Sequence, residues 1–153
     1  MNILKERHLV VKHSVSRGRD TYGYQIVALW DGNKRFATCG GGYDMLGAVF
    51  GDWLSANYMD RLKELVPYDE DLSMRMFQEK GYQPHQENYG LFCRQGHWCV
   101  DGACGLSTML GLAEKIGLSV KQLSDRRGYC TIGFIVSDNV CEQNKNKEEI
   151  LCV

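Results

Sequence analysis

The chain of 153 residues is near the usual size of one domain, and it is long enough to bury most of its apolar surface in a single core. Its hydrophobic fraction of 44% and charged fraction of 24% are those of an ordinary globular protein, and no apolar run approaches the ~20 residues that span a bilayer. A net charge of -1 excludes binding through a strong charge of one sign over the whole surface.

The N-terminus and the cysteines indicate a reducing compartment. The N-terminal sequence MNILKERHLVVKH carries charges where a secretory signal would be apolar, so we expect the protein to stay in the cytoplasm. Seven cysteines are an odd number and cannot all pair within one chain. In a reducing compartment, cysteines serve as apolar core residues, metal ligands or nucleophiles, and the first of these is the default.

The first forty residues predict an antiparallel meander of three strands. Leu9 and Val11 alternate with Lys12, which is the period of a half-buried strand. Residues 22–30 are rich in aromatic and β-branched side chains, and the following Asp-Gly-Asn is a strong hairpin signal before a third strand over 34–39. Both parities of the 22–30 strand carry apolar residues, so the sequence does not decide which of them faces solvent.

A long amphipathic helix is predicted to cover one face of this meander. Asp44 follows three glycines and can cap a helix. Apolar residues then recur at three- and four-residue steps from Leu46 to Val66, immediately before Pro67. A weaker helix is predicted over 71–80.

The second half of the chain holds most of the cysteines and is less regular. Residues 81–103 show no periodic pattern, and a loop of this length is more often functional or metal-braced than empty. The patterns that follow predict a helix over 106–116, a short helix over 118–125, a buried strand over 129–136 and a polar, frayed tail from about 138. Because no repeat or linker interrupts the chain, residues 1–153 are predicted to form a single α+β domain.

Four potential zinc ligands lie close together in the sequence, namely Cys93, His97, Cys99 and Cys104. Zinc prefers thiolate and imidazole ligands in a tetrahedron, and the neighbouring glycines would allow tight turns around one ion. The spacing matches no standard zinc finger, ribbon or knuckle. The default expectation is therefore reduced core cysteines without a cofactor, and zinc binding is the alternative.

Residues 101–123 (DGACGLSTMLGLAEKIGLSVKQL) raise the question of a nucleophile at Cys104. This segment resembles the nucleophile segment of papain-like bacteriocin-processing peptidases, in which Cys-Gly-Leu opens a buried helix. The resemblance implies a cysteine hydrolase whose thiolate is stabilised by a helix N-terminus. Those peptidases place the base histidine downstream, whereas no histidine follows His97 here, so His97 could act only in a rearranged topology. We therefore expect a protein that is not an enzyme.

The same region also contains the spacing of a helix-turn-helix motif. Ala113, Gly117 and Leu123 have the separations of the small residue, turn glycine and apolar anchor, and Lys121 with Arg126 or Arg127 would then point toward DNA. The alternative, which the following strand favours, is a helix that ends at Gly117 and is followed by a turn.

Three consecutive glycines, Gly40, Gly41 and Gly42, join the predicted third strand to the long helix. Free amide groups in such a loop can bind an anion before a helix N-terminus. The segment lacks the lysine and Ser/Thr of a P-loop, and Asp44 would repel phosphate. Close packing of the helix on the sheet is the competing explanation.

The meander also carries cations among aromatic side chains. The candidate binding residues are Arg17, Arg19, Tyr22, Tyr24, Lys34 and Arg35. Aromatic faces among cations on a sheet bind single-stranded nucleic acid, although aromatic residues in a meander also form core and cross-strand pairs.

Residues 15–54 (VSRGRDTYGYQIVALWDGNKRFATCGGGYDMLGAVFGDWL) resemble small proteins encoded by bacteriophages and prophages. The resemblance implies a protein of the bacterial host cytoplasm that binds a host protein or nucleoprotein complex stoichiometrically, in the class of anti-CRISPR and other anti-defence inhibitors. Membrane association is not expected. The alternatives are a zinc-braced DNA- or RNA-binding protein and a papain-like cysteine hydrolase.

Overall fold

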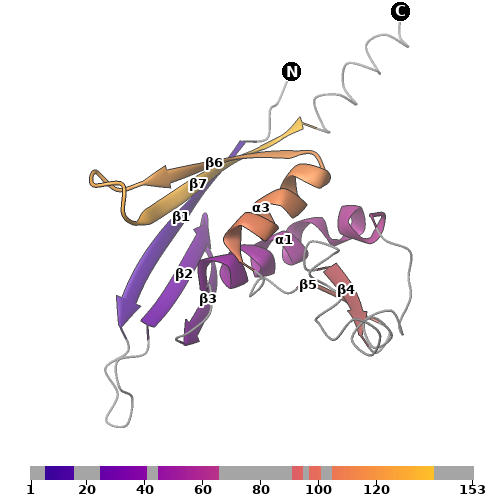
Figure 1. Ribbon diagram of the computed structural model, residues 1–153, viewed down its shortest axis with the longest axis horizontal. Helices are drawn as coiled ribbons and strands as arrows, with labels where there is room; N and C mark the ends of the chain where they lie inside the picture. Colours follow the sequence, from indigo (N-terminus) through magenta and orange to yellow (C-terminus); the bar gives the residue numbers. More distant parts are fainter. Residues whose placement is uncertain are drawn as a thin grey trace, which may run out of the picture.

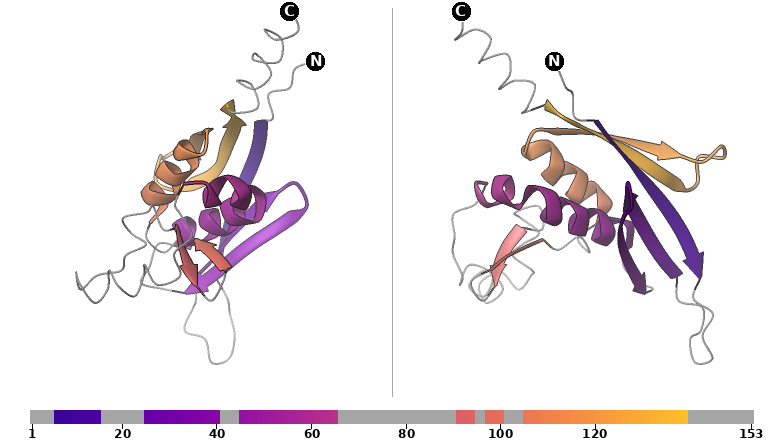
Figure 2. Two further views of the ribbon diagram at one scale, coloured as in Figure 1. Left: turned by 90° about the vertical axis from the view of Figure 1, so that its right-hand side faces the viewer. Right: turned by 180° about the vertical axis from the view of Figure 1, so that it is seen from behind.

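The computed structural model describes residues 6–15, 25–40, 45–65, 91–94, 97–100 and 105–139. In chain order the elements are β1 (Glu6–Val15), β2 (Gln25–Asp31), β3 (Lys34–Gly40), α1 (Met45–Lys63), β4 (Leu91–Arg94), β5 (His97–Val100), α3 (Leu106–Lys115), β6 (Leu118–Ser124) and β7 (Thr131–Asp138). Five strands form an antiparallel sheet in the order β3-β2-β1-β7-β6, and α1 and α3 lie on one of its faces (Figures 1 and 2). The predicted α+β class is confirmed, and none of the described helices is long and apolar enough to cross a membrane.

The predicted N-terminal meander is confirmed. Strand β1 pairs with β2, and β2 pairs with β3, in antiparallel register. The β2–β3 hairpin turns at Gly32 and Asn33, as the Asp-Gly-Asn signal predicts. Gly32 has φ of +63°, a left-handed conformation in which glycine carries no steric cost.

The second half of the chain completes the same sheet. Strand β7 pairs with β1, so that β1 lies at the centre, and β6 pairs with β7 at the outer edge. The buried strand expected over 129–136 corresponds to β7. The short helix expected over 118–125 is wrong, because Leu118 and Val120 alternate with exposed Ser119 and Lys121 along strand β6.

Helix α1 supplies the largest buried side chains. Its Val49, Phe50, Trp53 and Leu54 are fully buried, and the helix packs against β2, β3 and α3. The Phe50 ring lies 4.9 Å from the ring of Phe134 on β7 and therefore ties the helix to the central strands. Helical geometry is interrupted at Tyr58 (φ −132°, ψ 22°), where a kink separates the last turn.

Helix α3 closes the other half of the covered face. It packs against α1 and β6, with Met109, Leu112 and Ala113 buried. Gly117, at φ of +91°, follows the helix and lets the chain reverse directly into β6. Strands β4 and β5 form a separate hairpin, so the expectation that 81–103 is irregular throughout is wrong for these residues. The helix expected over 71–80 and the tail beyond 139 lie outside the described residues.

Two partly buried polar links fix helix α1 to the sheet. Arg61 of α1 donates to both carboxylate oxygens of Asp138 at the end of β7, at 3.0 and 2.7 Å. Asp31, at the end of β2, accepts hydrogen bonds from Arg7 at 2.8 Å and from the Trp53 indole at 2.9 Å. The carboxylates of both aspartates are thereby used inside the fold.

Candidate binding interface

The face of the sheet opposite α1 and α3 is here called the open face. No described helix covers it (Figure 2). Its parity is fixed by the core: Val27 and Leu29 of β2 are buried beneath the helices, so Ile26, Ala28 and Trp30 belong to the open face. This assignment shows which side of β2 faces outward, which the sequence does not decide.

One row of side chains crosses all five strands of the open face. Cross-strand pairing aligns Arg35 with Trp30, Trp30 with Val10, Val10 with Gly133, and Gly133 with Leu123. Trp30 and Leu123 are half-buried, while Val10 is 46% exposed. The row therefore presents an indole and aliphatic groups to solvent, with a guanidinium at one end.

Gly133 leaves a gap in the middle of this row. A Cβ atom at this position would lie 2.5 Å from the backbone oxygen of Leu9 on β1, closer than van der Waals contact allows. Glycine is therefore required by the close approach of β1 and β7, and its missing side chain lowers the surface between Val10 and Leu123.

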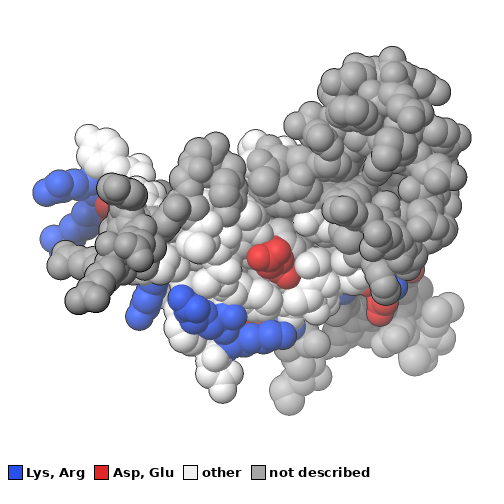
Figure 3. Space-filling view, turned by 90° about the horizontal axis from the view of Figure 1, so that it is seen from below, with Lys and Arg blue, Asp and Glu red and all other residues white. Residues whose placement is uncertain are grey.

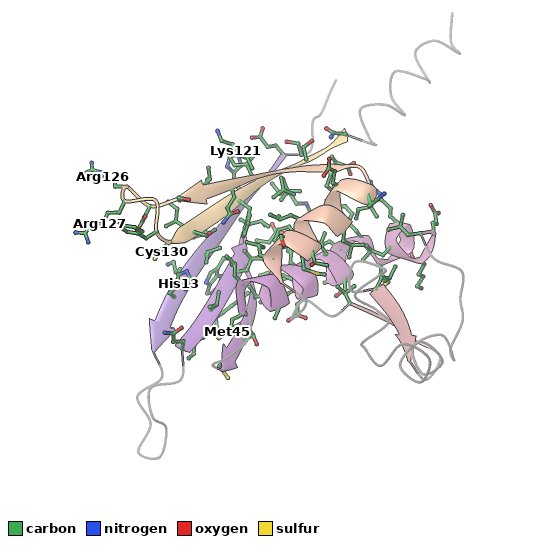
Figure 4. The ribbon with its side chains drawn as sticks, in the orientation of Figure 1. His13, Met45, Lys121, Arg126, Arg127 and Cys130 are labelled. Carbon is green, nitrogen blue, oxygen red and sulfur yellow. The ribbon has the colours of Figure 1, made fainter. Side chains whose placement is uncertain are left out.

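Cations flank the row on both sides. Lys12 follows Val10 by two positions on β1. Lys121 precedes Leu123 by two positions on β6 and lies opposite Ile135. His8, opposite Ile135 from the other side, lies 3.5 Å from Glu6, and both of these side chains are exposed. Lys12 and Lys121 are also exposed (Figure 4 labels Lys121).

The hairpin between β6 and β7 extends this basic surface beyond the sheet. Its turn is held by Asp125, whose carboxylate accepts the backbone N–H groups of Tyr129 at 3.0 Å and Cys130 at 3.4 Å. Gly128 supplies the left-handed residue at φ of +74°. Arg126 and Arg127 project from the tip into solvent (Figure 4), and Tyr129 is 84% exposed.

Three described acidic groups of the sheet and its β6–β7 turn are engaged in contacts within the fold, whereas Glu6 is exposed on the open face. Asp31 and Asp138 face helix α1, Asp125 holds its own turn, and Glu6 lies against His8. The remaining described acidic residues lie on or directly after the helices, at Asp52, Asp60, Glu64 and Glu114. Seen from below, Lys and Arg side chains lie at the left-hand end of the molecule and along its lower edge, and an acidic group lies near the centre (Figure 3). The described part of the open face and the tip carries more cations than acidic groups, although the net charge of the chain is only -1.

Burial affects two ionisable side chains on the helical side. Partial desolvation raises the pKa of the Asp52 carboxyl above its usual value. The pKa of the Tyr58 hydroxyl is also raised, chiefly by burial, with Arg7 acting in the opposite direction. Both residues belong to helix α1, which covers the opposite face of the sheet, so neither adds charge to the open face.

The predicted basic residues of the meander are only partly described. Arg17, Arg19, Tyr22 and Tyr24 lie outside the described residues. Lys34 and Arg35 are both exposed on β3, but their neighbouring positions place them on opposite faces. Arg35 joins the row on the open face, whereas Lys34 lies 5.3 Å from the centroid of the Phe36 ring.

The helix-turn-helix hypothesis is wrong in its geometry, because residues 118–124 form strand β6 where the second helix would lie. Its three basic residues nevertheless reach the same surface: Lys121 lies on the open face, and Arg126 and Arg127 lie at the tip. Sequence reasoning missed Lys12, Trp30 and Tyr129, which required knowledge of strand pairing and of the hairpin turn.

The predicted chemical sites fall largely outside the described residues. Cys93, His97 and Cys99 lie on the β4–β5 hairpin, where the backbone pairs Cys93 with Trp98, Arg94 with His97 and Phe92 with Cys99. The side chains of these three residues are not described, and neither is Cys104. Gly40 ends β3 opposite Gln25, and Gly41 and Gly42 are not described. Zinc binding, the Cys104 nucleophile with His97, and the anion loop therefore stay predictions.

Comparisons of the chain with protein-family models, with curated proteins and with solved structures found no match.

Proposed function

We propose that this protein is a non-catalytic binding protein that engages single-stranded nucleic acid through the open face and the β6–β7 tip. The observation that carries the proposal is the cross-strand row from Arg35 through Trp30 to Leu123, with Lys12 and Lys121 beside it. Bases can stack on an indole and lie against aliphatic groups, while the cations contact the phosphates.

The distribution of charge supports nucleic acid over an uncharged partner. The open face and tip carry Lys12, Arg35, Lys121, Arg126 and Arg127. The described acidic groups of the same surface are Glu6, which is exposed beside His8, and Asp125, whose carboxylate holds the turn. An anionic backbone that follows the row would meet cations at both ends of the sheet. A double helix is a poorer fit, because a sheet face with a partly accessible indole favours unstacked bases.

This activity is compatible with the phage-type class that the sequence resemblance implies. A protein that covers single-stranded DNA or RNA acts stoichiometrically, and it can block the host nucleoprotein complex that needs the same strand. The identity of that complex, and the anti-CRISPR or other anti-defence role, stay part of the proposal.

The proposal is tested by fluorescence anisotropy with a labelled single-stranded oligonucleotide over a range of salt concentrations. We expect binding to weaken with salt, with a slope that decreases by about 0.7 for each contacting cation that is neutralised. The variant Lys12→Gln combined with Arg35→Gln should therefore lower the slope by about 1.4. Lys63→Gln, on the exposed end of α1, is the matched control and should leave the slope unchanged.

Stacking is tested separately at Trp30. Trp30→Ala should weaken oligonucleotide binding by about fivefold or more, since stacking on an aromatic side chain contributes roughly 1–3 kcal/mol per base. Trp30→Phe should recover most of the loss. If both the charge variant and Trp30→Ala bind as tightly as Lys63→Gln, or if the oligonucleotide does not bind at low salt, the open face is not a nucleic-acid interface.

A further inference from the structure

Strand β6 lies at an edge of the sheet. Among the described strands it pairs only with β7. The N–H of Asn139 donates to the carbonyl of Gly117 at 2.9 Å. The adjacent pair, Leu118 and Asp138, is therefore a non-hydrogen-bonded pair of the antiparallel ladder. The alternation of an antiparallel ladder then directs the backbone groups of Leu118, Val120 and Gln122 away from β7, toward the outer edge.

An open groove of about 500 Å³ runs between α3 and β6 beside this edge. Leu110, Leu118 and Val120 provide its apolar surface, and Ser107, Glu114 and Ser119 provide its polar groups. Helix α3 packs against edge strand β6, and the groove opens along this contact.

We propose that the β6 edge and this groove bind an extended peptide segment of a partner protein as an added strand. The outward backbone groups of Leu118, Val120 and Gln122 would pair with the peptide backbone. Alternate peptide side chains would enter the groove and contact Leu110 and Val120. This site shares only Lys121 with the proposed nucleic-acid interface, and it does not rest on that interface.

The charges beside the edge define the peptide more narrowly. Lys121 is at the middle of β6 and lies on the open face, so it favours an acidic residue at the centre of the peptide on that side. Glu114 at the groove is exposed and favours a basic residue on the other side. The fitting segment therefore has alternating aliphatic residues, one central acid and one terminal base.

A second copy of this chain fits the edge less well. Two β6 strands that pair antiparallel over their whole length would place Lys121 directly opposite Lys121 of the other copy. Like charges directly opposite in a sheet are destabilising, and lysine on an edge strand opposes self-pairing. The charge pattern therefore favours a different chain as the occupant.

The test is amide hydrogen exchange by NMR on the full-length protein. In the free protein, the amides of Leu118, Val120 and Gln122 should exchange fast, and those of Ser119, Lys121 and Leu123 slowly, because the latter donate toward β7. The probe is the synthetic peptide VTVDVTK at saturating concentration. It should slow exchange at the first three amides by about tenfold or more, while the same peptide N-methylated at alternate residues should not.

Each alternative gives a distinct result. Slow exchange at Leu118, Val120 and Gln122 in the free protein at every concentration would mean that the chain covers its own edge. Slow exchange that appears only at high protein concentration would mean that a second copy occupies it. Either result, or unchanged exchange with the probe, overturns the proposal.

Two variants keep the test independent of folding. Gln122→Pro removes one outward N–H without removing a backbone hydrogen bond to β7, and it should abolish slowing at Leu118 and Val120. It also removes the side-chain hydrogen bond from Gln122 to Thr131, a loss that the control Gln122→Ala reproduces while it keeps the outward N–H. Glu114→Lys changes only an exposed side chain and should weaken the probe several-fold. The charge-swapped peptide VTVDVTE should restore binding to Glu114→Lys, and its failure to do so would refute the assigned orientation of the peptide toward α3.

Discussion

Removal of the Asp138 carboxylate should destabilise this protein more than any exposed charge change. Arg61 donates to Asp138 at 3.0 and 2.7 Å and approaches the carbonyl of Ile116 at 3.4 Å, so one guanidinium joins α1, the end of α3 and the end of β7. Asp138 is only 3% exposed. The side chain of Arg61 is 27% exposed, so its charge keeps some contact with water after the partner is removed.

The expected magnitude follows from this geometry. Loss of one partner of a buried ion pair costs roughly 3–5 kcal/mol, and the partial exposure of Arg61 reduces that figure. We expect Asp138→Asn to lower the free energy of unfolding by about 2–3 kcal/mol, a large share of the roughly 5–15 kcal/mol typical of a domain.

Urea denaturation followed by tryptophan fluorescence measures this difference through the midpoint and the slope of the transition. The control is Glu6→Gln, which removes an exposed contact of 3.5 Å to His8 and should change the unfolding free energy by less than about 0.5 kcal/mol. A loss below about 1 kcal/mol for Asp138→Asn, or one equal to that of Glu6→Gln, would refute the assignment of Arg61 and Asp138 as the link between helices and sheet.

Three further outcomes follow from the described contacts. Gly133→Ala should lower the unfolding free energy by about 2 kcal/mol or more, since its Cβ would lie 2.5 Å from the Leu9 oxygen. Gly128→Ala has open space around its Cβ and meets only backbone strain, so it should cost about 1 kcal/mol. Equal losses of the two variants in urea denaturation would contradict this reasoning. Burial raises the pKa of Asp52 in the folded state above its ordinary value of 3.8, so stability falls as pH rises from 3.8 through the folded pKa. Asp52→Asn should therefore have a larger unfolding free energy than the parent chain at pH 7, and a smaller one would contradict the shift. Alkylation of exposed Cys130, read by mass spectrometry, should slow several-fold when a single-stranded oligonucleotide is bound, and an unchanged rate would remove the tip from the interface.

Local patterns predict the parts of this fold that local residues determine. The Asp-Gly-Asn turn and the alternation in β1 are readable within a short window, and the hairpin and strand form where expected. A helix forms over Met45–Lys63, within the range in which the apolar steps predict a long amphipathic helix. The pairing of β1 with β7 is different, because most of the sequence lies between the paired residues Leu9 and Phe134. No pattern in either segment specifies the other, so the sequence could not show that its two halves share one sheet.

The candidate interface could be predicted only in part, because local sequence patterns show residue types but not strand pairing. The sequence identifies Arg35 as a cation among aromatic residues. That Arg35 and Lys34 lie on opposite faces of β3 depends on which face of the sheet α1 covers. The sequence predicts Lys121 with Arg126 or Arg127 as DNA-facing residues of a helix-turn-helix motif. In the structure, Lys121 lies on strand β6, and Arg126 and Arg127 lie in the β6–β7 turn. The residue types were therefore informative, while their placement required the sheet.

The two proposed surfaces share one side chain, and this has a consequence for how they would act together. Lys121 lies on the open face, where it is available to a phosphate, and it is also the central charge beside the β6 edge. A peptide acid that pairs with Lys121 would remove one cation from the nucleic-acid interface, and the bound nucleic acid would equally oppose that acid. Because coupling between two sites is reciprocal, a partner with a central acid would weaken nucleic-acid binding, whereas one with a neutral residue there would leave it unchanged. The structure thus offers a simple physical route by which a protein partner could regulate nucleic-acid binding through the edge strand alone.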